Sequence, residues 1–169
     1  KPTGLGAKTL AFAPDGNTIV SGAGYTDAAI QLWDVRTGAH RGTLEGHRSW
    51  VTSLAFSRDG RELFSASADQ TIRRWDWNKR AAAGVLRGHR FTVNQVLAAP
   101  DGRTLASNTQ QGEVFLWPLD EPARPPTVRR LAATLESAVF TADGQAIPFS
   151  GRDVRIPPGA VNITIDYAP

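Results

Sequence analysis

The sequence predicts an all-β protein built from four copies of a four-stranded antiparallel unit. The stretch 46–77 recurs 42 residues later, so that His47 matches His89 and Trp75 matches Trp117. Asp-Gly pairs separate short apolar runs at regular intervals, and no stretch shows a sustained helical period. A repeat of this length is typical of architectures in which each unit buries its apolar face against the next.

The first two strands of each unit flank an Asp-Gly turn. Gly accepts the positive φ of a tight hairpin turn, so Asp-Gly between apolar runs predicts a hairpin. The turns begin at Asp15, Asp59, Asp101 and Asp143. The strands before them are 9–13, 51–56, 93–99 and 137–142, and those after them are 17–23, 61–67, 103–108 and 145–150.

The third and fourth strands complete each unit. The third strands are 29–35, 71–77, 113–119 and a weak copy at 153–157, and the outer strands are 40–45, 83–87, 127–132 and 161–167. All are short and rich in β-branched and apolar residues. The proline-rich stretch 119–127 predicts an exposed loop, with a domain linker as the alternative.

Composition limits the class of protein. The 169 residues include 41% hydrophobic and 21% charged residues and no cysteine, which is typical of a soluble globular chain without disulfides or Cys-based zinc sites. No signal-like or membrane-spanning segment is present. This favours the cytoplasm, although a cysteine-free chain tolerates both redox environments. The chain starts at Lys1 and contains no Met, so we expect a piece of a longer polypeptide.

The net charge of +3 comes from scattered basic residues. A nucleic-acid-binding surface usually concentrates them on one face or one helix. The charge pattern therefore favours an ordinary solvated surface.

Gly-His, Asp-Gly and Trp-Asp in this order resemble the WD-repeat β-propeller family, most strongly over residues 46–118. The resemblance implies one WD-repeat segment, residues 1–169, with blades at about 1–45, 46–87, 88–132 and 133–169. Four blades would form an open arc or part of a larger propeller. We expect another protein, or the remainder of a longer polypeptide, to cover the two open blade faces.

The resemblance also implies a buried hydrogen-bond set in each blade. In the second blade its members are His47, Ser65, Asp69 and Trp75. The third blade keeps His89, Ser107 and Trp117 but has Gln111 at the Asp position, where an uncharged acceptor predicts a weaker set. The first blade keeps Ser21, Asp27 and Trp33 without a Gly-His, and the fourth is degenerate.

A Ser-His-Asp set also suggests a hydrolase, but we expect no catalytic residues. The set recurs in successive units and no oxyanion-hole motif such as G-x-S-x-G accompanies it. Only three His are present, so we expect no metal site, and the sequence indicates no cofactor.

Candidate binding residues lie in the loops between blades. Arg48, Ser49 and Trp50 form one loop, and Arg90 and Phe91 match them in the next. An aromatic residue beside an Arg is typical of a binding hot spot. Alternatively, Trp50 and Phe91 only cover the loops against neighbouring blades.

Arg74 is unusual because the matching positions hold Leu32 and Leu116. A side chain there should point between blades, and a buried Arg needs a carboxylate partner. Arg74 therefore marks a channel or interface site, or else its head group reaches the edge.

These observations predict a non-catalytic scaffold that presents its inter-blade loops to a protein partner. One alternative is an accessory propeller fragment of a larger multidomain enzyme. The other is a phosphate-binding or nucleic-acid-binding module that uses Arg48 and Arg90.

Overall fold

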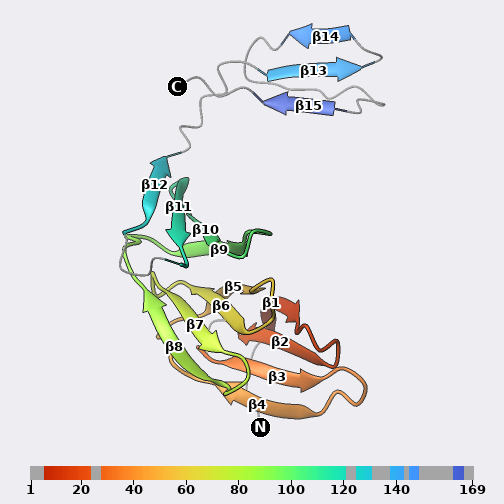
Figure 1. The fold of residues 1–169 in the computed structure, drawn as a ribbon, viewed down its shortest axis with the longest axis vertical. Helices are drawn as coiled ribbons and strands as arrows, with labels where there is room; N and C mark the ends of the chain where they lie inside the picture. Colours follow the sequence, from red (N-terminus) through yellow and green to blue (C-terminus); the bar gives the residue numbers. More distant parts are fainter. Residues whose placement is uncertain are drawn as a thin grey trace. The chain divides into compact units, whose positions relative to one another are not determined.

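The structure is a computed structural model, and it describes residues 6–23, 28–120, 125–130, 138–142, 145–148 and 162–165. All regular elements in these residues are β-strands, arranged in separate antiparallel sheets (Figure 1). The chain forms two compact units, Lys1–Leu131 and Ala132–Pro169. The predicted all-β class is confirmed.

The first unit contains three four-stranded sheets, and in each sheet the strands pair in chain order. The first sheet comprises β1 (Ala7–Phe12), β2 (Thr18–Ala23), β3 (Ile30–Asp34) and β4 (His40–Leu44). The second comprises β5 (Val51–Phe56), β6 (Glu62–Ser67), β7 (Ile72–Asp76) and β8 (Ala81–Leu86). The third comprises β9 (Val93–Ala98), β10 (Thr104–Thr109), β11 (Glu113–Pro118) and β12 (Thr127–Arg130).

The Asp-Gly pairs form the first hairpin of each of these sheets. Gly16, Gly60 and Gly102 have φ values of 65°, 70° and 71°, which an L side chain rarely adopts. The Gly102 amide donates to the carbonyl of Ala99 at 3.0 Å, and the matching bonds close the other two turns. The fourth pair, Asp143-Gly144, lies outside the described residues.

The second sheet is buried on both of its faces. Its inner strand β5 contacts both β1 and β9, so the three sheets stack side by side. One core joins it to the first sheet and contains Val20, Ile30, Leu54, Leu63 and Trp75. The other core joins it to the third sheet and contains Phe64, Ile72, Val93, Leu105 and Trp117. Burial on both faces makes the second sheet the best-packed frame for adjoining loops.

The first sheet has an uncovered apolar face. Leu10 pairs with Ser21 as Leu54 pairs with Ser65, yet Leu10 is 64% exposed and Leu54 is 8% exposed. Phe12, two residues along the same strand, is 65% exposed. In the second sheet, the face that carries Leu54 packs against the first sheet.

The second unit departs from the predicted strand order. It contains β13 (Ala138–Ala142), β14 (Gln145–Pro148) and β15 (Asn162–Ile165), in the order β14-β13-β15. The outer strand was expected beside the third strand at 153–157, which lies outside the described residues. The sequence of that segment lacks the Trp of the other third strands. The Ile-rich β15 pairs with β13 instead.

The loops of the first unit lie at two opposite ends of its strands. The Gly-His rim consists of residues 46–50, 68–71, 88–92 and 110–112. The Asp-Gly rim consists of residues 13–17, 35–39, 57–61, 77–80, 99–103 and 119–120. Antiparallel pairing in chain order fixes this division.

Candidate functional site

A buried hydrogen-bond chain fixes the base of the Gly-His rim in the second sheet. The Trp75 indole N–H donates to Ser65 Oγ at 2.8 Å. The Ser65 hydroxyl is then free to donate to His47 Nε2, 2.7 Å away, while His47 Nδ1–H donates to Asp69 Oδ2 at 2.8 Å. The structure thus brings together the four residues predicted for this blade.

The Asp69 carboxylate ties two loops together. Its Oδ2 also accepts from the Arg48 amide at 2.9 Å, and its Oδ1 accepts from the Thr71 amide at 3.0 Å and hydroxyl at 2.6 Å. Burial alone would raise the pKa of Asp69, but the hydrogen bonds from His47, Thr71 and Arg48 hold it well below its usual range. Asp69 is therefore a charged, fully used acceptor.

The third sheet keeps only part of this chain. Ser107 Oγ lies 2.9 Å from both His89 Nε2 and Trp117 Nε1, but His89 Nδ1 is buried without a partner among the described residues. Gln111, expected to serve as the acceptor, is exposed. Burial lowers the pKa of His89 to about 4, although the nearby Gln70 carbonyl and Glu113 act in the opposite direction.

In the first sheet, the histidine beside Trp33 comes from the outer strand and not from a Gly-His loop. Trp33 Nε1 donates to Ser21 Oγ at 2.8 Å, while Asp27 lies outside the described residues. His40, from β4, packs against the Trp33 ring at 5.2 Å between centroids and bonds Gln31 at 2.7 Å. Sequence reasoning missed this role because His40 stands outside the Gly-His position.

In the first loop of the Gly-His rim, residues 46–50, hydrogen bonds fix the backbone, but the Arg48 side chain makes no ion pair with the described residues. The Ser49 carbonyl accepts from the Ser67 hydroxyl at 3.0 Å, and the Trp50 carbonyl accepts from the Ala68 amide at 3.1 Å. Arg48 is exposed and has no ion-pair partner among the described residues. Trp50 is partly buried, and Lys8 Nζ lies 5.1 Å from its ring centroid. Lys8 was not among the predicted residues.

The second rim loop repeats this arrangement beside the first. Arg90 is exposed, Phe91 is 41% exposed, and the Thr92 carbonyl accepts from the Gln110 amide at 3.4 Å. The Thr52 hydroxyl donates to the Val93 carbonyl at 2.5 Å, so the strands that leave the two loops lie side by side. Two adjacent loops therefore each present an Arg next to an aromatic residue.

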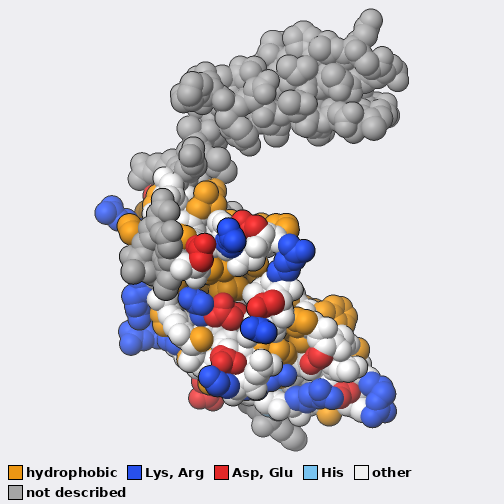
Figure 2. Space-filling model, in the orientation of Figure 1, with side chains coloured by type: hydrophobic (Ala, Val, Ile, Leu, Met, Phe, Trp, Pro, Cys, Tyr) orange, Lys and Arg blue, Asp and Glu red, His pale blue; other side chains and the backbone are white. Residues whose placement is uncertain are grey.

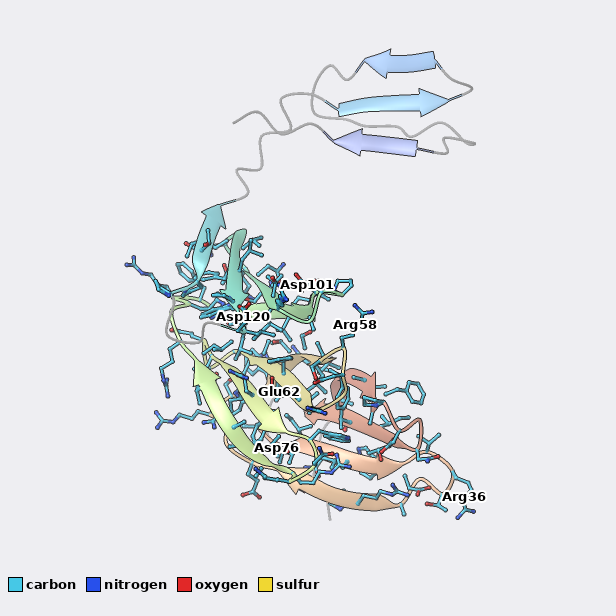
Figure 3. The ribbon with its side chains drawn as sticks, viewed as in Figure 1. Arg36, Arg58, Glu62, Asp76, Asp101 and Asp120 are labelled. Carbon is cyan, nitrogen blue, oxygen red and sulfur yellow. The ribbon has the colours of Figure 1, made fainter. Side chains whose placement is uncertain are left out.

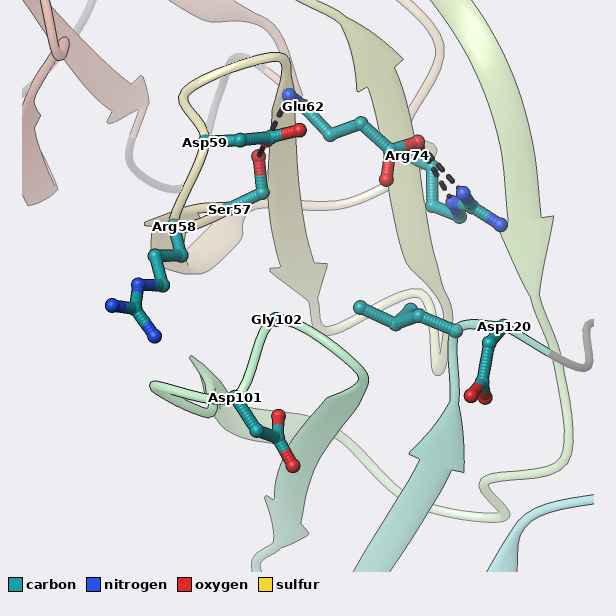
Figure 4. A pocket seen from close by; sticks show the side chains of 9 residues that line it. Ser57, Arg58, Asp59, Glu62, Arg74, Asp101, Gly102 and Asp120 are labelled. Atoms are coloured by element: carbon teal, nitrogen blue, oxygen red, sulfur yellow. Dashed lines mark hydrogen bonds and ion pairs between the residues drawn. The ribbon is translucent and has the colours of Figure 1, made fainter.

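Arg74 lies away from these loops, at a cavity of about 500 Å³ beside the Asp-Gly rim. Its Nε and Nη2 donate to Glu62 Oε1 at 3.1 and 2.7 Å, so Glu62 is the carboxylate partner (Figure 4). The cavity lies between the second and third sheets, and Arg58, Asp101 and Asp120 also line it.

Glu62 was not identified from the sequence, because its role becomes visible only when two positions are compared between the repeats at the same time. Thr18 and Thr104 match Glu62, and Leu32 and Leu116 match Arg74. The second blade thus replaces a Thr and a Leu with an ion pair. Comparing the copies position by position would have revealed both changes together.

The Ser-His-Asp geometry fits a structural role. Ser65 is 0% exposed, and the Trp75 indole already occupies its oxygen, so no substrate carbonyl can reach it. Among the residues that the structure describes, no three His, Asp or Glu side chains are grouped to hold a metal ion. In the same residues, no helix is long and apolar enough to cross a bilayer.

Stacked four-stranded sheets, one with a complete Trp-Ser-His-Asp chain and two with parts of it, define a propeller-blade repeat protein. The family model described as WD domain, G-beta repeat matches residues 6–34, 38–76 and 82–118, more than half of the chain. The chain therefore belongs to the WD-repeat family.

Curated relatives match short segments. Pre-mRNA-processing factor 19 of Oryza sativa is 38% identical over 64 residues, which cover 38% of this chain and 12% of that protein. Coronin-7 of Mus musculus is 36% identical over 61 residues, 36% of this chain and 6% of that protein. Nuclear distribution protein PAC1-2 of Uncinocarpus reesii is 45% identical over 56 residues, 33% of this chain and 12% of that protein. The matched segments thus span a small share of these relatives.

Proposed function

We propose that this chain is a non-catalytic protein-interaction scaffold that binds its partner at the Gly-His rim. The observation that carries the proposal is the division of roles within one loop. His47 and the Arg48 amide are held by Asp69, whereas the Arg48 guanidinium is exposed and unused by the fold. The adjacent loop also presents exposed Arg90 and Phe91 side chains, although its base lacks the carboxylate that Asp69 supplies. Arg and aromatic side chains that the fold leaves exposed are available to a partner. Because the loop backbone is already rigid, binding costs little conformational entropy of the loop.

Quantitative affinity capture tests this proposal. The wild-type chain, the rim variant R48A/F91A and the control R36A, which removes an exposed Arg at the Asp-Gly rim, are compared on one cell extract. We expect proteins that the wild type and R36A retain and that R48A/F91A loses. Equal retention by all three chains would contradict the Gly-His rim as the binding surface.

We further propose that a blade of the same type covers the open face of the first sheet. Leu10 and Phe12 support this, because the matching face of the second sheet is buried against a neighbouring blade. The blade could come from a longer polypeptide, as in an accessory propeller fragment of a multidomain protein, or from another chain. Light scattering of the chain tests the second source. We expect self-association that L10S/F12S abolishes, whereas a monomer at all concentrations would exclude a second copy.

A further inference from the structure

We infer that the partner segment bound at the Gly-His rim is acidic, a peptide rich in Asp or Glu that also carries an aromatic side chain. This inference rests on the proposed function, because it names the chemistry of the partner at the same surface. It follows from an uneven pairing of charges between the two rims.

The Asp-Gly rim neutralises its own charges. Four ion pairs of Arg or Lys with carboxylates join described residues at or beside this rim, namely Arg41–Asp34, Arg61–Asp59, Arg74–Glu62 and Lys79–Asp76. Lys and Arg side chains accordingly alternate with Asp and Glu on the face seen in Figure 2. Arg36, Arg58, Asp76 and Asp101 are among the charged residues located in Figure 3.

The Gly-His rim lacks this balance. Asp69 already accepts four hydrogen bonds, and Glu113 is only 7% exposed. In the described part of the rim and its flanks, Glu45 is the one exposed carboxylate. Arg48, Arg87 and Arg90 are exposed there. The excess of positive charge attracts a negatively charged partner.

Arg73 adds an unsatisfied donor under the same loop. Its Nε is buried without a partner among the described residues. Its guanidinium lies against Gly46, because a Cβ placed at Gly46 would be 2.7 Å from Nη1. Because Nε is closed to solvent, Arg73 contributes positive charge beneath the loop and not a hydrogen-bonding site for the partner. The exposed guanidinium groups of Arg48 and Arg90 are the ones that a partner reaches, and a carboxylate suits them because it can accept two parallel hydrogen bonds.

The aromatic side chains favour a peptide over a nucleic acid. Phe91 is 41% exposed and Trp50 is partly buried, so each rim loop offers apolar surface beside its Arg. Nucleic-acid affinity depends on a series of phosphate contacts along a basic stripe. Here single arginines alternate with apolar surface, which fits acidic side chains on either side of an aromatic one.

The experiment is a selection of random peptides displayed on phage against the full chain, with depletion against R48E/R90E. R36E/R103E makes the same change in charge at the Asp-Gly rim and serves as the matched control. All four arginines are exposed, so we expect both variants to unfold at the wild-type temperature. The selected peptides should be enriched in Asp, Glu and aromatic residues. R48E/R90E should weaken their binding by at least about tenfold, and R36E/R103E should change it by less than about twofold.

Each alternative outcome is distinct. Neutral or basic peptides that still require Arg48 and Arg90 would overturn this inference and leave the proposed function in place. A selection that yields no rim-dependent peptide would count against both. A single-stranded oligonucleotide that binds the wild type more tightly than any selected peptide, and that R48E/R90E no longer binds, would replace the acidic peptide with a nucleic acid.

Discussion

Asp69→Asn is the sharpest test of the hydrogen-bond chain. The two carboxylate oxygens serve two pairs of donors, one from His47 and the Arg48 amide and one from the amide and hydroxyl of Thr71. An amide nitrogen must replace one oxygen, so one pair of donors loses its acceptor. Each unsatisfied buried donor costs about 1–3 kcal/mol and the exposed Arg48 amide costs less, so we expect a total loss of about 2–4 kcal/mol.

Gln111→Asn is the matched control for this substitution. The residues that follow Asp69 and Gln111 are Gln70, with φ of 68°, and Gly112, with φ of 75°, so the two turns have similar backbones. Gln111 is exposed, and its replacement should change stability by less than about 0.5 kcal/mol.

Urea unfolding followed by tryptophan fluorescence measures both variants. With a slope of about 2 kcal/mol per molar urea, Asp69→Asn should lower the midpoint by about 1–2 M. The slope itself should stay unchanged. A midpoint within about 0.3 M of the Gln111→Asn value would refute the hydrogen-bond chain as a stabilising feature.

Three further predictions concern stability. The pKa of His89 is about 4 in the folded chain, below its ordinary value of 6.5, so the unfolded chain gains the proton first and stability falls as the pH drops below 6.5. We expect a loss of about 2 kcal/mol by pH 5 in urea titrations, a loss that His89→Asn reduces. Trp75→Phe should lower the free energy of unfolding by about 2–4 kcal/mol and Trp33→Phe by about 1 kcal/mol, because Trp75 is buried and Trp33 is only partly buried. Equal losses in the two variants would contradict this explanation. Arg74→Leu alone should cost about 1 kcal/mol, whereas E62T/R74L should restore stability, because it removes both charges of a partly buried pair. A double variant no more stable than the single one would contradict that explanation.

The sheets of the first unit were predictable because their signals are local and repeated. Asp-Gly sets each hairpin through the positive φ of its Gly, and Trp75 and Trp117 identify the third strands. The family assignment follows from the same signals. The fourth copy keeps the Asp-Gly pair but lacks the Trp, and its strand order departs from the prediction.

The side-chain details were less predictable because they depend on orientation across strands. Gln111 could in principle accept from His89, but the longer side chain is exposed and leaves Nδ1 unsatisfied. Arg74 required a carboxylate, but only cross-strand register identifies it as Glu62. Contact between Lys8 and Trp50 depends on how two sheets stack, which one strand's sequence does not specify.

On our proposal, the buried hydrogen-bond chain that includes Ser65 stabilises the Gly-His rim, whereas the exposed Arg48 and Arg90 bind the partner. Comparing Ser65→Ala with R48E/R90E tests this division of roles directly. For each variant, the urea midpoint of unfolding and the affinity for a rim-binding peptide are measured. We predict that Ser65→Ala loses about 2–4 kcal/mol of stability and, at a temperature where it is folded, keeps its affinity. R48E/R90E should keep its stability and lose at least about tenfold in affinity. The reverse pattern, or loss of both properties in both variants, would contradict the claim.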